Sequence, residues 1–312
     1  MSQCAFYLCF SMENFVQIDP KSENTPKVFG TMLGAIGPRP IAFASTVDKD
    51  GNPNLSPFSF FNGFGANPPI VVFSPSRRVR DNTTKHTLEN VKATGEVVIS
   101  VVNHAIVEQM SLSSTEYGLG VDEFIKSGLT PLESQLVKPF RVKESPVSME
   151  CKVVDIVELG TEGGAGNLVI CEVVMFHVHP DVLDDNGVID QTKIDLVGRM
   201  GGDWYCRANG DALFEIEKPL RTLGIGVDQI PEDIRNSRIL TGNDLGRLGN
   251  VEQIPSELDV NDYKLYELSE IFLEHEDNAI RLEEELHKIA KEHINNNQIE
   301  LAWKTLLAFN DQ

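Results

Sequence analysis

The sequence predicts a mainly β fold, an antiparallel barrel or sandwich, followed by an α-helical extension at the C-terminal end. Residues 40–180 contain many short runs of Val, Ile and Phe bounded by Gly, Pro, Asn and Asp, a pattern typical of short strands. These runs follow one another without long helices between them, whereas a doubly wound α/β sheet alternates strands with helices. From about Thr222 the apolar residues take helical spacing instead.

The strand-rich region opens with Ile41–Val47. Asp48-Lys49-Asp50-Gly51 then predicts a hairpin turn, because glycine adopts positive φ without strain. Asn54–Phe64 is the expected return strand. Further apolar runs predict more strands, and the segments between some of them predict short helices. The strands are Ile70–Phe73, Glu96–Val102, Met149–Leu159 and Leu168–His179, and the helices are Asn82–Ala93, Ala105–Leu112 and Asp122–Ser127.

The last part of the chain has a different pattern. Leu223–Pro255 is rich in Gly, Asn and Asp and is expected to form an ordered connector. Asp262–Ile294 carries apolar residues at helical spacing over an acidic face, and Ile299–Phe309 predicts a second helix after an Asn-rich break. Such a helical hairpin must bury its apolar stripe, so we expect it to lie on the barrel or on another subunit.

Composition narrows the functional classes. Of 312 residues, 41% are hydrophobic, and the 47 acidic and 27 basic residues give a net charge of −20, which disfavours nucleic-acid and anionic membrane partners. No apolar run is long enough to span a bilayer, and the five scattered cysteines indicate a reducing, cytoplasmic setting. Met1–Phe10 lacks the features of a signal peptide. We expect an N-terminal extension (1–24), a barrel domain (25–221), and a connector with an acidic helical hairpin (222–312).

The segment Arg77–Asn90 concentrates positive charge in this acidic chain. Three arginines and a lysine lie within nine positions between Arg77 and Lys85, and threonines from Thr83 to Thr87 add hydroxyls. They precede or enter a predicted helix, whose first turn presents unpaired N–H groups and partial positive charge. The pattern indicates a phosphate site, and a solvated basic helix start is the alternative interpretation.

A second informative segment places three phenylalanines within four residues, ahead of Asn62 and Gly63. Strand alternation would put Phe58 and Phe60 on one face and Ser59 and Phe61 on the other. This arrangement could form a wall for a planar ring, with small polar groups at the ring edge. A core strand that contributes aromatic side chains explains the same residues.

Other motifs with chemical meaning are weak or missing. The sequence has no phosphate loop, no complete G-x-G-x-x-G, no G-x-S-x-G and no H-E-x-x-H. His177 and His179 would share one strand face, but a metal needs further ligands that nothing nearby supplies. We therefore interpret them as polar residues at a strand end and expect no metal site.

Several of these motifs together resemble the flavin reductase-like, FMN-binding split-barrel family. The resemblance covers about residues 25–220, and the motifs occur in the family's order. They are Gly37–Thr46, Asp50-Gly51, Asn54–Asn62, Pro68-Pro69, Lys85–Thr87 with Asn90, Asp122–Phe124, Gly128–Thr130, Glu144–Pro146 and Val197–Tyr205. His86 stands where the family commonly has Asp, which makes this position more positive when His86 is protonated.

This resemblance implies a six-stranded antiparallel Greek-key split β-barrel, a homodimer, and FMN bound at or near the subunit interface. Carried over by position, the residues lining the flavin ring would be Ser45, Thr46, Ser59, Phe60, Phe61 and Asn62. Lys85 and Thr87 would hold the phosphate, and Arg39 would lie close to the flavin. Arg199, Trp204 and Tyr205 are candidates for contacts on the substrate side, although a packed strand end accounts for them equally well.

The expected activity is hydride transfer from NADH or NADPH to the flavin, and from there to free flavin or another acceptor. Such transfer depends on stacking and alignment more than on a protein acid or base, so no catalytic residue is assigned. One alternative is a flavoredoxin-like electron carrier without NAD(P)H activity. Another is a flavin-free interaction module whose acidic tail recruits a basic partner.

Overall fold

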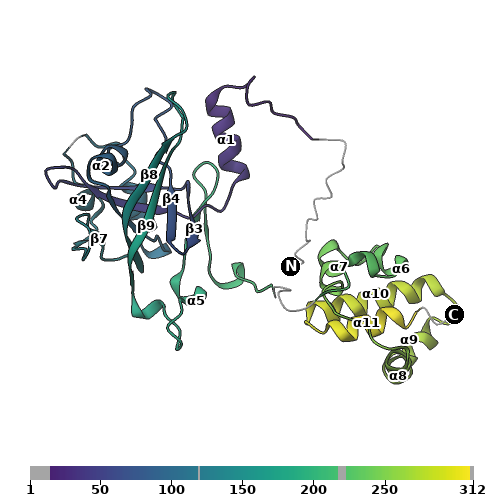
Figure 1. Ribbon diagram of the computed structural model, residues 1–312. Helices are drawn as coiled ribbons and strands as arrows, with labels where there is room; N and C mark the ends of the chain where they lie inside the picture. Colours follow the sequence, from purple (N-terminus) through teal and green to yellow (C-terminus); the bar gives the residue numbers. More distant parts are fainter. Residues whose placement is uncertain (1–14, 119, 217–222, 310–312) are drawn as a thin grey trace. The chain divides into compact units, whose positions relative to one another are not determined.

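The computed structural model describes residues 15–118, 120–216 and 223–309. The chain forms two compact units that divide between Phe214 and Glu215. One is built around a β-sheet and the other from helices (Figure 1). Residues 1–14 of the predicted N-terminal extension and the domain boundary predicted at 221 and 222 lie outside the described residues.

The first unit contains a seven-stranded sheet in the order β2-β1-β5-β8-β9-β4-β3, and every pair of neighbours is antiparallel. Its strands are β1 (Ala42–Val47), β2 (Pro53–Phe58), β3 (Phe61–Ala66), β4 (Pro69–Phe73), β5 (Glu96–Ser100), β8 (Val147–Glu158) and β9 (Asn167–Val178). Two small antiparallel ribbons accompany it, β6 (Pro131–Leu132) with β7 (Arg141–Val142), and β10 (Val197–Arg199) with β11 (Tyr205–Arg207). The large antiparallel sheet agrees with the predicted barrel.

The expected number of six strands is wrong, because the return strand predicted over Asn54–Phe64 is broken at Ser59 and Phe60. Its first half, β2, pairs with β1, whereas its second half, β3, pairs with β4 at the opposite edge of the sheet. We call Ser59 and Phe60 the strand crossing. A single stretch of chain therefore supplies both edge strands and carries the sheet toward closure.

The strand crossing also overturns the predicted alternation of the phenylalanines. Phe58 and Phe61 both pack on the same barrel core, together with Phe73 and Leu88. Two residues without ladder pairing between β2 and β3 break the period of two, so Phe61 does not share a face with Ser59. The predicted hairpin turn is confirmed, with Gly51 at a φ of 88° and its N–H donating to the Asp48 carbonyl oxygen.

Helices interrupt the strand set much as predicted. They are α2 (His86–Thr94), α3 (Val107–Leu112) preceded by the short 3-10 helix η1 (His104–Ile106), and α4 (Glu123–Ser127). Smaller elements are α5 (Gln191–Ile194), η2 (Pro180–Val182) and η3 (Gly210–Ala212). The helix α2 starts four residues later than predicted, because Asn82, at a φ of 58°, bends the chain into a loop.

The sequence pattern did not predict α1 (Thr25–Ala35). Its glycines, Gly30 and Gly34, are poor helix formers, and none of its residues is fully buried, so it lacks a clear apolar stripe. A helix start signal is nevertheless present. The side chain of Asn24 accepts a hydrogen bond from the Lys27 N–H at 2.9 Å, and proline occupies the first turn.

The second unit is a helical bundle with its own core. It contains η4 (Val227–Gln229), α6 (Glu232–Arg235), α7 (Gly242–Leu248), α8 (Glu257–Glu267), α9 (Ser269–Glu274), α10 (Ala279–Asn295) and α11 (Ile299–Leu307). The helix predicted over Asp262–Ile294 is thus divided into three. Leu268 separates α8 from α9, and Asn278 caps α10 through a bond from the Arg281 N–H.

The apolar stripe of the predicted hairpin is buried within this unit, so the expectation that it lies on the barrel or on another subunit is wrong. Ile294 of α10 packs with Trp303 of α11, and the supposed connector supplies Ile234 and Leu248 to the same cluster. Leu265, one of the apolar residues within the helix predicted over Asp262–Ile294, is 63% exposed. Among the described residues, no helix is both long and apolar enough to span a membrane.

Candidate functional site

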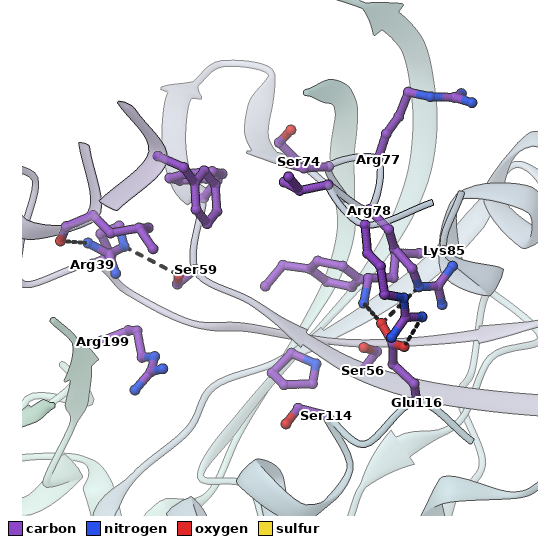
Figure 2. A pocket seen from close by; sticks show the side chains of 18 residues that line it. Arg39, Ser56, Ser59, Ser74, Arg77, Arg78, Lys85, Ser114, Glu116 and Arg199 are labelled. Carbon is purple, nitrogen blue, oxygen red and sulfur yellow. Dashed lines mark hydrogen bonds and ion pairs between the residues drawn. The ribbon is translucent and has the colours of Figure 1, made fainter. Parts of the chain in front are cut away.

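An open cavity of about 400 Å³ lies where the strand crossing meets α1 and the loop after β4 (Figure 2). Its two ends differ in chemistry. Aromatic and aliphatic side chains gather at one end together with Arg39 and Arg199, and Arg78, Arg80 and Lys85 lie at the other. The lining residues are Phe29, Leu33, Arg39, Ser56, Pro57, Phe58, Ser59, Phe60, Ser74, Ser76, Arg77, Arg78, Val79, Arg80, Lys85, Ser114, Glu116 and Arg199.

The apolar end is formed by the strand crossing and by α1. The rings of Phe60 and Phe29 meet edge to face, with centroids 5.9 Å apart. Leu33, one helical turn after Phe29, lines the same end of the cavity. Phe58 lines it as well and also packs on the barrel core, which fixes the position of this wall.

Arg39 lines the cavity, but its donors are already engaged. It is only 4% exposed, and Nη1 donates to the carbonyl oxygens of Leu33, at 2.7 Å, and Ile36. Nη2 donates to Met200 O at 2.7 Å, and Nε donates to Ser59 Oγ at 3.3 Å. Burial, and then the nearby charge of Arg199, lower the pKa of Arg39. Arg39 therefore holds the wall of the cavity together.

The cationic end consists of Arg78, Arg80 and Lys85, which we call the basic cluster, and Glu116 lies between them. Figure 2 shows Glu116 beside Arg78 and Lys85. Arg78 Nε lies 3.0 Å from Glu116 Oε1, and Arg80 Nη2 lies 2.9 Å from Oε2. Lys85 Nζ lies 3.9 Å from Oε1. Hydrogen bonds from Arg80 and Arg78 lower the pKa of Glu116, so the carboxylate is charged at neutral pH.

The other predicted basic residue points elsewhere. Arg77 turns away from the basic cluster (Figure 2) and donates to Asn82 through Nε and Nη2. Lys85 remains in the cluster as the N-cap residue of α2, where no side chain caps the helix. Burial is the main cause that lowers the pKa of Lys85, followed by the charge of Arg78. A further negative charge in this cavity would relieve that repulsion.

Thr87 and Thr46 join a polar network behind the cavity. Asn54 Nδ2 donates to Thr87 Oγ1 at 2.9 Å and to Thr46 Oγ1 at 3.5 Å, and Asn90 Nδ2 also donates to Thr46, at 3.0 Å. Thr87 lines a small pocket that adjoins the basic cluster at Lys85. The buried hydroxyl of Ser45 has no hydrogen-bond partner within the described part of the chain.

Phe61 and Asn62, both predicted ring contacts, lie away from the cavity lining. Phe61 packs against the barrel core, and Asn62 is exposed, with its side chain accepting a bond from the Gly63 N–H. Of the predicted ring-lining residues, Ser59 and Phe60 line the cavity, and Ser45, Thr46, Phe61 and Asn62 do not. The broken strand explains the difference at Phe61, because the residues after the crossing belong to the opposite sheet edge.

The predicted substrate-side residues lie on the β10–β11 ribbon. Arg199 lines the main cavity and a second pocket of about 150 Å³ that also contains Tyr205, Ser59 and Ser114. Its guanidinium carbon lies 4.5 Å above the centre of the Tyr205 ring. Trp204 is 77% exposed and lines neither pocket. The structure thus brings Arg199 and Tyr205 together beside the strand crossing.

Some lining residues carry no signal in the sequence. Phe29 and Leu33 belong to the unpredicted α1, although the Asn24 cap and Pro26 could have indicated a helix there. Ser114 and Glu116 lie in a polar loop without periodicity, far along the chain from the basic cluster. No local pattern could place that carboxylate among these cations.

The two histidines considered for a metal site have other partners. His177 Nε2 lies 2.6 Å from Oε1 of the buried Glu150, and His179 Nδ1 lies 3.5 Å from Asp181 Oδ2. Within residues 15–118, 120–216 and 223–309, no three His, Cys, Asp or Glu side chains are grouped closely enough to hold a metal ion.

The family model described as "Flavin reductase like domain" matches residues 35–194. The chain belongs to this family. An uncharacterized protein of Aquifex aeolicus is 36% identical over 196 residues, which cover 63% of this chain and 97% of the relative. An uncharacterized protein of Halalkalibacterium halodurans is 34% identical over 206 residues, which cover 65% of this chain and 97% of that protein.

Two solved structures support the flavin reductase-like assignment. Nitrilotriacetate monooxygenase component B from Bacillus cereus is 29% identical, with a TM-score of 0.61, covering 65% of this chain and 99% of its own. A protein from Shewanella frigidimarina, titled a putative flavin reductase with split barrel domain, is 31% identical, with a TM-score of 0.54, covering 64% and 95%. Family membership indicates a flavin-binding protein with oxidoreductase chemistry. The residues after 194, including Arg199 and the helical unit, lie outside the family match.

Proposed function

We propose that this protein is an FMN-dependent oxidoreductase of the flavin reductase type. It takes hydride from NADH or NADPH and passes the electrons to free flavin or to another acceptor. The observation that carries the proposal is one cavity with an aromatic wall at one end and three cations at the other. Its volume of about 400 Å³ is within the usual range for small-molecule sites.

The basic cluster fits a phosphate monoester. Arg78, Arg80 and Lys85 already converge on one anionic side chain, so their donors are oriented for oxygen ligands. Thr87 and the first turn of α2 adjoin Lys85, where peptide N–H groups add partial positive charge. In this proposal Lys85 binds the phosphate, and Thr87 supports it from the adjoining pocket.

The opposite end fits the flavin ring. Phe60, with Phe29 packed edge-on, offers an apolar surface, while Ser59 adds a hydroxyl beside it. The proposed cofactor supplies a ring that accepts and releases hydride. These side chains orient that ring and exclude water from it. Arg39 keeps the strand crossing, α1 and the Met200 carbonyl in fixed relation.

The remaining predicted ring residues contribute indirectly. Thr46 positions Asn54 and, through it, Thr87. Phe61 anchors the strand crossing to the core. Ser45 and Asn62 would reach the cofactor through backbone groups or from the partner of a dimer.

The second pocket, with Arg199 and Tyr205, would receive the nicotinamide or the acceptor, and the exposed Trp204 would lie at its rim.

The proposal includes a homodimer. The edge strand β3 and the neighbouring strands β8 and β9 expose large apolar side chains, among them Phe64 at 69%, Val154 at 59% and Phe176 at 54%. Soluble proteins usually cover such groups. Sedimentation of the purified protein should give a dimer, and Phe176→Asp should shift it toward monomer. A wild-type monomer at micromolar concentration would contradict this part of the proposal.

One experiment separates the candidate activities. Purified full-length protein is incubated with FMN, freed of unbound flavin, and mixed anaerobically with NADH or NADPH while visible absorbance is recorded. Bleaching of the bound flavin is the expected result. Bound flavin that stays oxidised would favour the electron carrier. Protein that binds no FMN would contradict both flavin functions and leave the flavin-free interaction module.

A further inference from the structure

We propose that Glu116 is an internal competitor for the phosphate of the flavin. Its carboxylate fills the basic cluster when no ligand is bound, and a phosphorylated ligand enters by displacing it. Glu116 therefore sets how strongly the site prefers FMN over riboflavin, which has the same ring but no phosphate. This inference rests on the proposed function, because it assumes that a flavin occupies the cavity.

The geometry of Glu116 is that of a ligand. Its two oxygens divide the cations between them, Oε1 facing Arg78 and Lys85 and Oε2 facing Arg80. Two of these contacts, at 3.0 and 2.9 Å, have the length of charge-assisted hydrogen bonds. Phosphate oxygens would accept hydrogen bonds from the same donors of Arg78, Arg80 and Lys85. A carboxylate and a phosphate held there together would repel each other in a partly desolvated cavity.

The guanidinium of Arg78 is held more firmly than the Glu116 carboxylate, whereas the side chain of Arg80 is 73% exposed. Arg78 Nη1 donates to Thr83 Oγ1 at 2.9 Å and to the Thr84 carbonyl oxygen, so its guanidinium keeps its place without Glu116. Lys85 lies at the start of α2. The Glu116 side chain is 42% exposed and lies in a surface turn, where the Tyr117 N–H donates to Thr115 O. Rotation into solvent is therefore open to it.

The exchange also balances charge. Asp81 accepts hydrogen bonds from the Thr83 hydroxyl and N–H and then pairs with Arg80 at 3.1 Å, which lowers the pKa of Asp81 to about 2 and keeps it ionised. When Glu116 leaves, the one carboxylate among the described residues still paired with the basic cluster is that of Asp81, on Arg80, so the three cations keep a net charge of about +2. A phosphate monoester carries a charge of about −1.5 to −2 at pH 7. The vacated cluster thus matches the phosphate of FMN.

This arrangement has a consequence for ligand exchange. Each FMN that binds must break the Glu116 contacts, so part of its interaction with the cations is offset. The Glu116 carboxylate returns when FMN leaves, so the positive charge of the basic cluster is again neutralised in part. Such a site holds FMN more weakly than the same cations would without Glu116, and this suits a flavin that exchanges. Riboflavin, without a phosphate, leaves the Glu116 contacts intact.

The test compares wild type, Glu116→Gln and Glu116→Ala by titration with FMN and with riboflavin. The side chain is exposed, so neither change threatens the fold. We expect Glu116→Gln to tighten FMN binding by about tenfold and to change riboflavin binding by less than about twofold. Glu108→Gln, an exposed carboxylate on α3 outside the cavity, removes the same charge and should leave both affinities unchanged.

The outcomes distinguish a failure of the proposed role of Glu116 from a failure of the proposed FMN-dependent function. If neither wild type nor Glu116→Gln binds FMN, the proposed function fails. If FMN binds but the ratio of FMN to riboflavin affinity is the same in all variants, the function stands and the role of Glu116 is refuted. Weaker FMN binding in both variants would also refute it, because Glu116 would then be holding the cations in place.

Discussion

Arg39 Nη2 donates a hydrogen bond to the carbonyl oxygen of Met200 at 2.7 Å, joining residues 161 positions apart. The same guanidinium binds the Leu33 and Ile36 carbonyl oxygens at the end of α1 and the Ser59 hydroxyl at the strand crossing. One buried side chain thus connects three segments around the cavity. The planar fork of arginine suits this task, because its donors point in several fixed directions.

Arg39→Lys should therefore destabilise the barrel unit. A lysine ammonium cannot reach all these acceptors at once, and buried carbonyls left unpaired cost about 2–4 kcal/mol in the free energy of unfolding. Urea denaturation followed by circular dichroism measures this loss. Arg141→Lys is the matched control, because Arg141 also donates twice to one carbonyl, that of Glu133, but at an exposed position. Equal losses in the two variants would contradict the assignment.

Lys85→Ala should weaken FMN binding by about tenfold, because it removes one of the cations proposed to bind the phosphate. Riboflavin affinity should stay nearly constant, and flavin fluorescence titration measures both. Lys92→Ala, on the same helix but paired with Glu158 outside the cavity, controls for the loss of a positive charge. Unchanged FMN affinity in Lys85→Ala would remove Lys85 from the phosphate site.

Trp303→Ala should destabilise the helical unit without weakening flavin binding. Trp303 is 1% exposed, and its Nε1 donates to the Leu248 carbonyl oxygen at 3.1 Å. Loss of the indole should cost about 3–5 kcal/mol in the helical unit. Calorimetry should show one thermal transition moving to lower temperature while FMN affinity is retained. Trp303→Phe keeps most of the apolar volume and should cost less.

The buried thiols of Cys171 and Cys151 should resist alkylation in the native protein. Burial raises the pKa of Cys171 to about 12, and burial, followed by the charge of Cys171, raises that of Cys151 well above its usual value. Iodoacetamide at mildly alkaline pH should leave both unmodified in peptide maps. The half-buried Cys206 provides an internal comparison. Rapid native-state modification of Cys171 would contradict the burial.

The same shift predicts how stability depends on pH. The pKa of Cys171 is higher in the folded state than the value of about 8.5 expected in an unfolded chain. The unfolded chain therefore loses this proton first as pH rises. The contribution of Cys171 to stability is complete below about pH 8.5 and declines above it, until pH reaches the folded-state pKa. Urea midpoints from pH 7 to 10 should fall, and Cys171→Ala should fall less steeply.

Much of the barrel could be predicted because its signals are local. Gly51 marks the first hairpin, and the apolar runs around Val97 and Val169 are buried strands. The break at Ser59 could not be predicted, because it depends on which sheet edge each half of the strand reaches. The same limit applies to Glu116, since its partners come from a distant loop. The sequence does not predict the core of the helical unit, because the residues that pack against α10 lie in a Gly-rich segment whose composition is typical of a connector.

The residues of the candidate site also fall into two groups, those that local sequence patterns predict and those that they do not. The sequence predicts Lys85 and Phe60 because the basic and aromatic residues cluster along the chain. The family resemblance places Arg39 near the flavin, but the role of Arg39 depends on backbone carbonyl groups, which have no sequence signature. Family resemblance supplied Arg199 and Tyr205, whose contact across the β10–β11 ribbon has no periodic signature.

Because Ser59 and Phe60 connect the two edge strands, we expect the two edges of the sheet to open together. Opening β2 pulls on the chain that leads directly into β3, and the Phe60 carbonyl oxygen is tied in turn to the Ser74 N–H at 2.9 Å. Amide hydrogens of β1 and β4, which lie on opposite sides of the sheet order, should therefore exchange with solvent in one cooperative event. A ligand resting on the crossing would slow exchange along both edges at once.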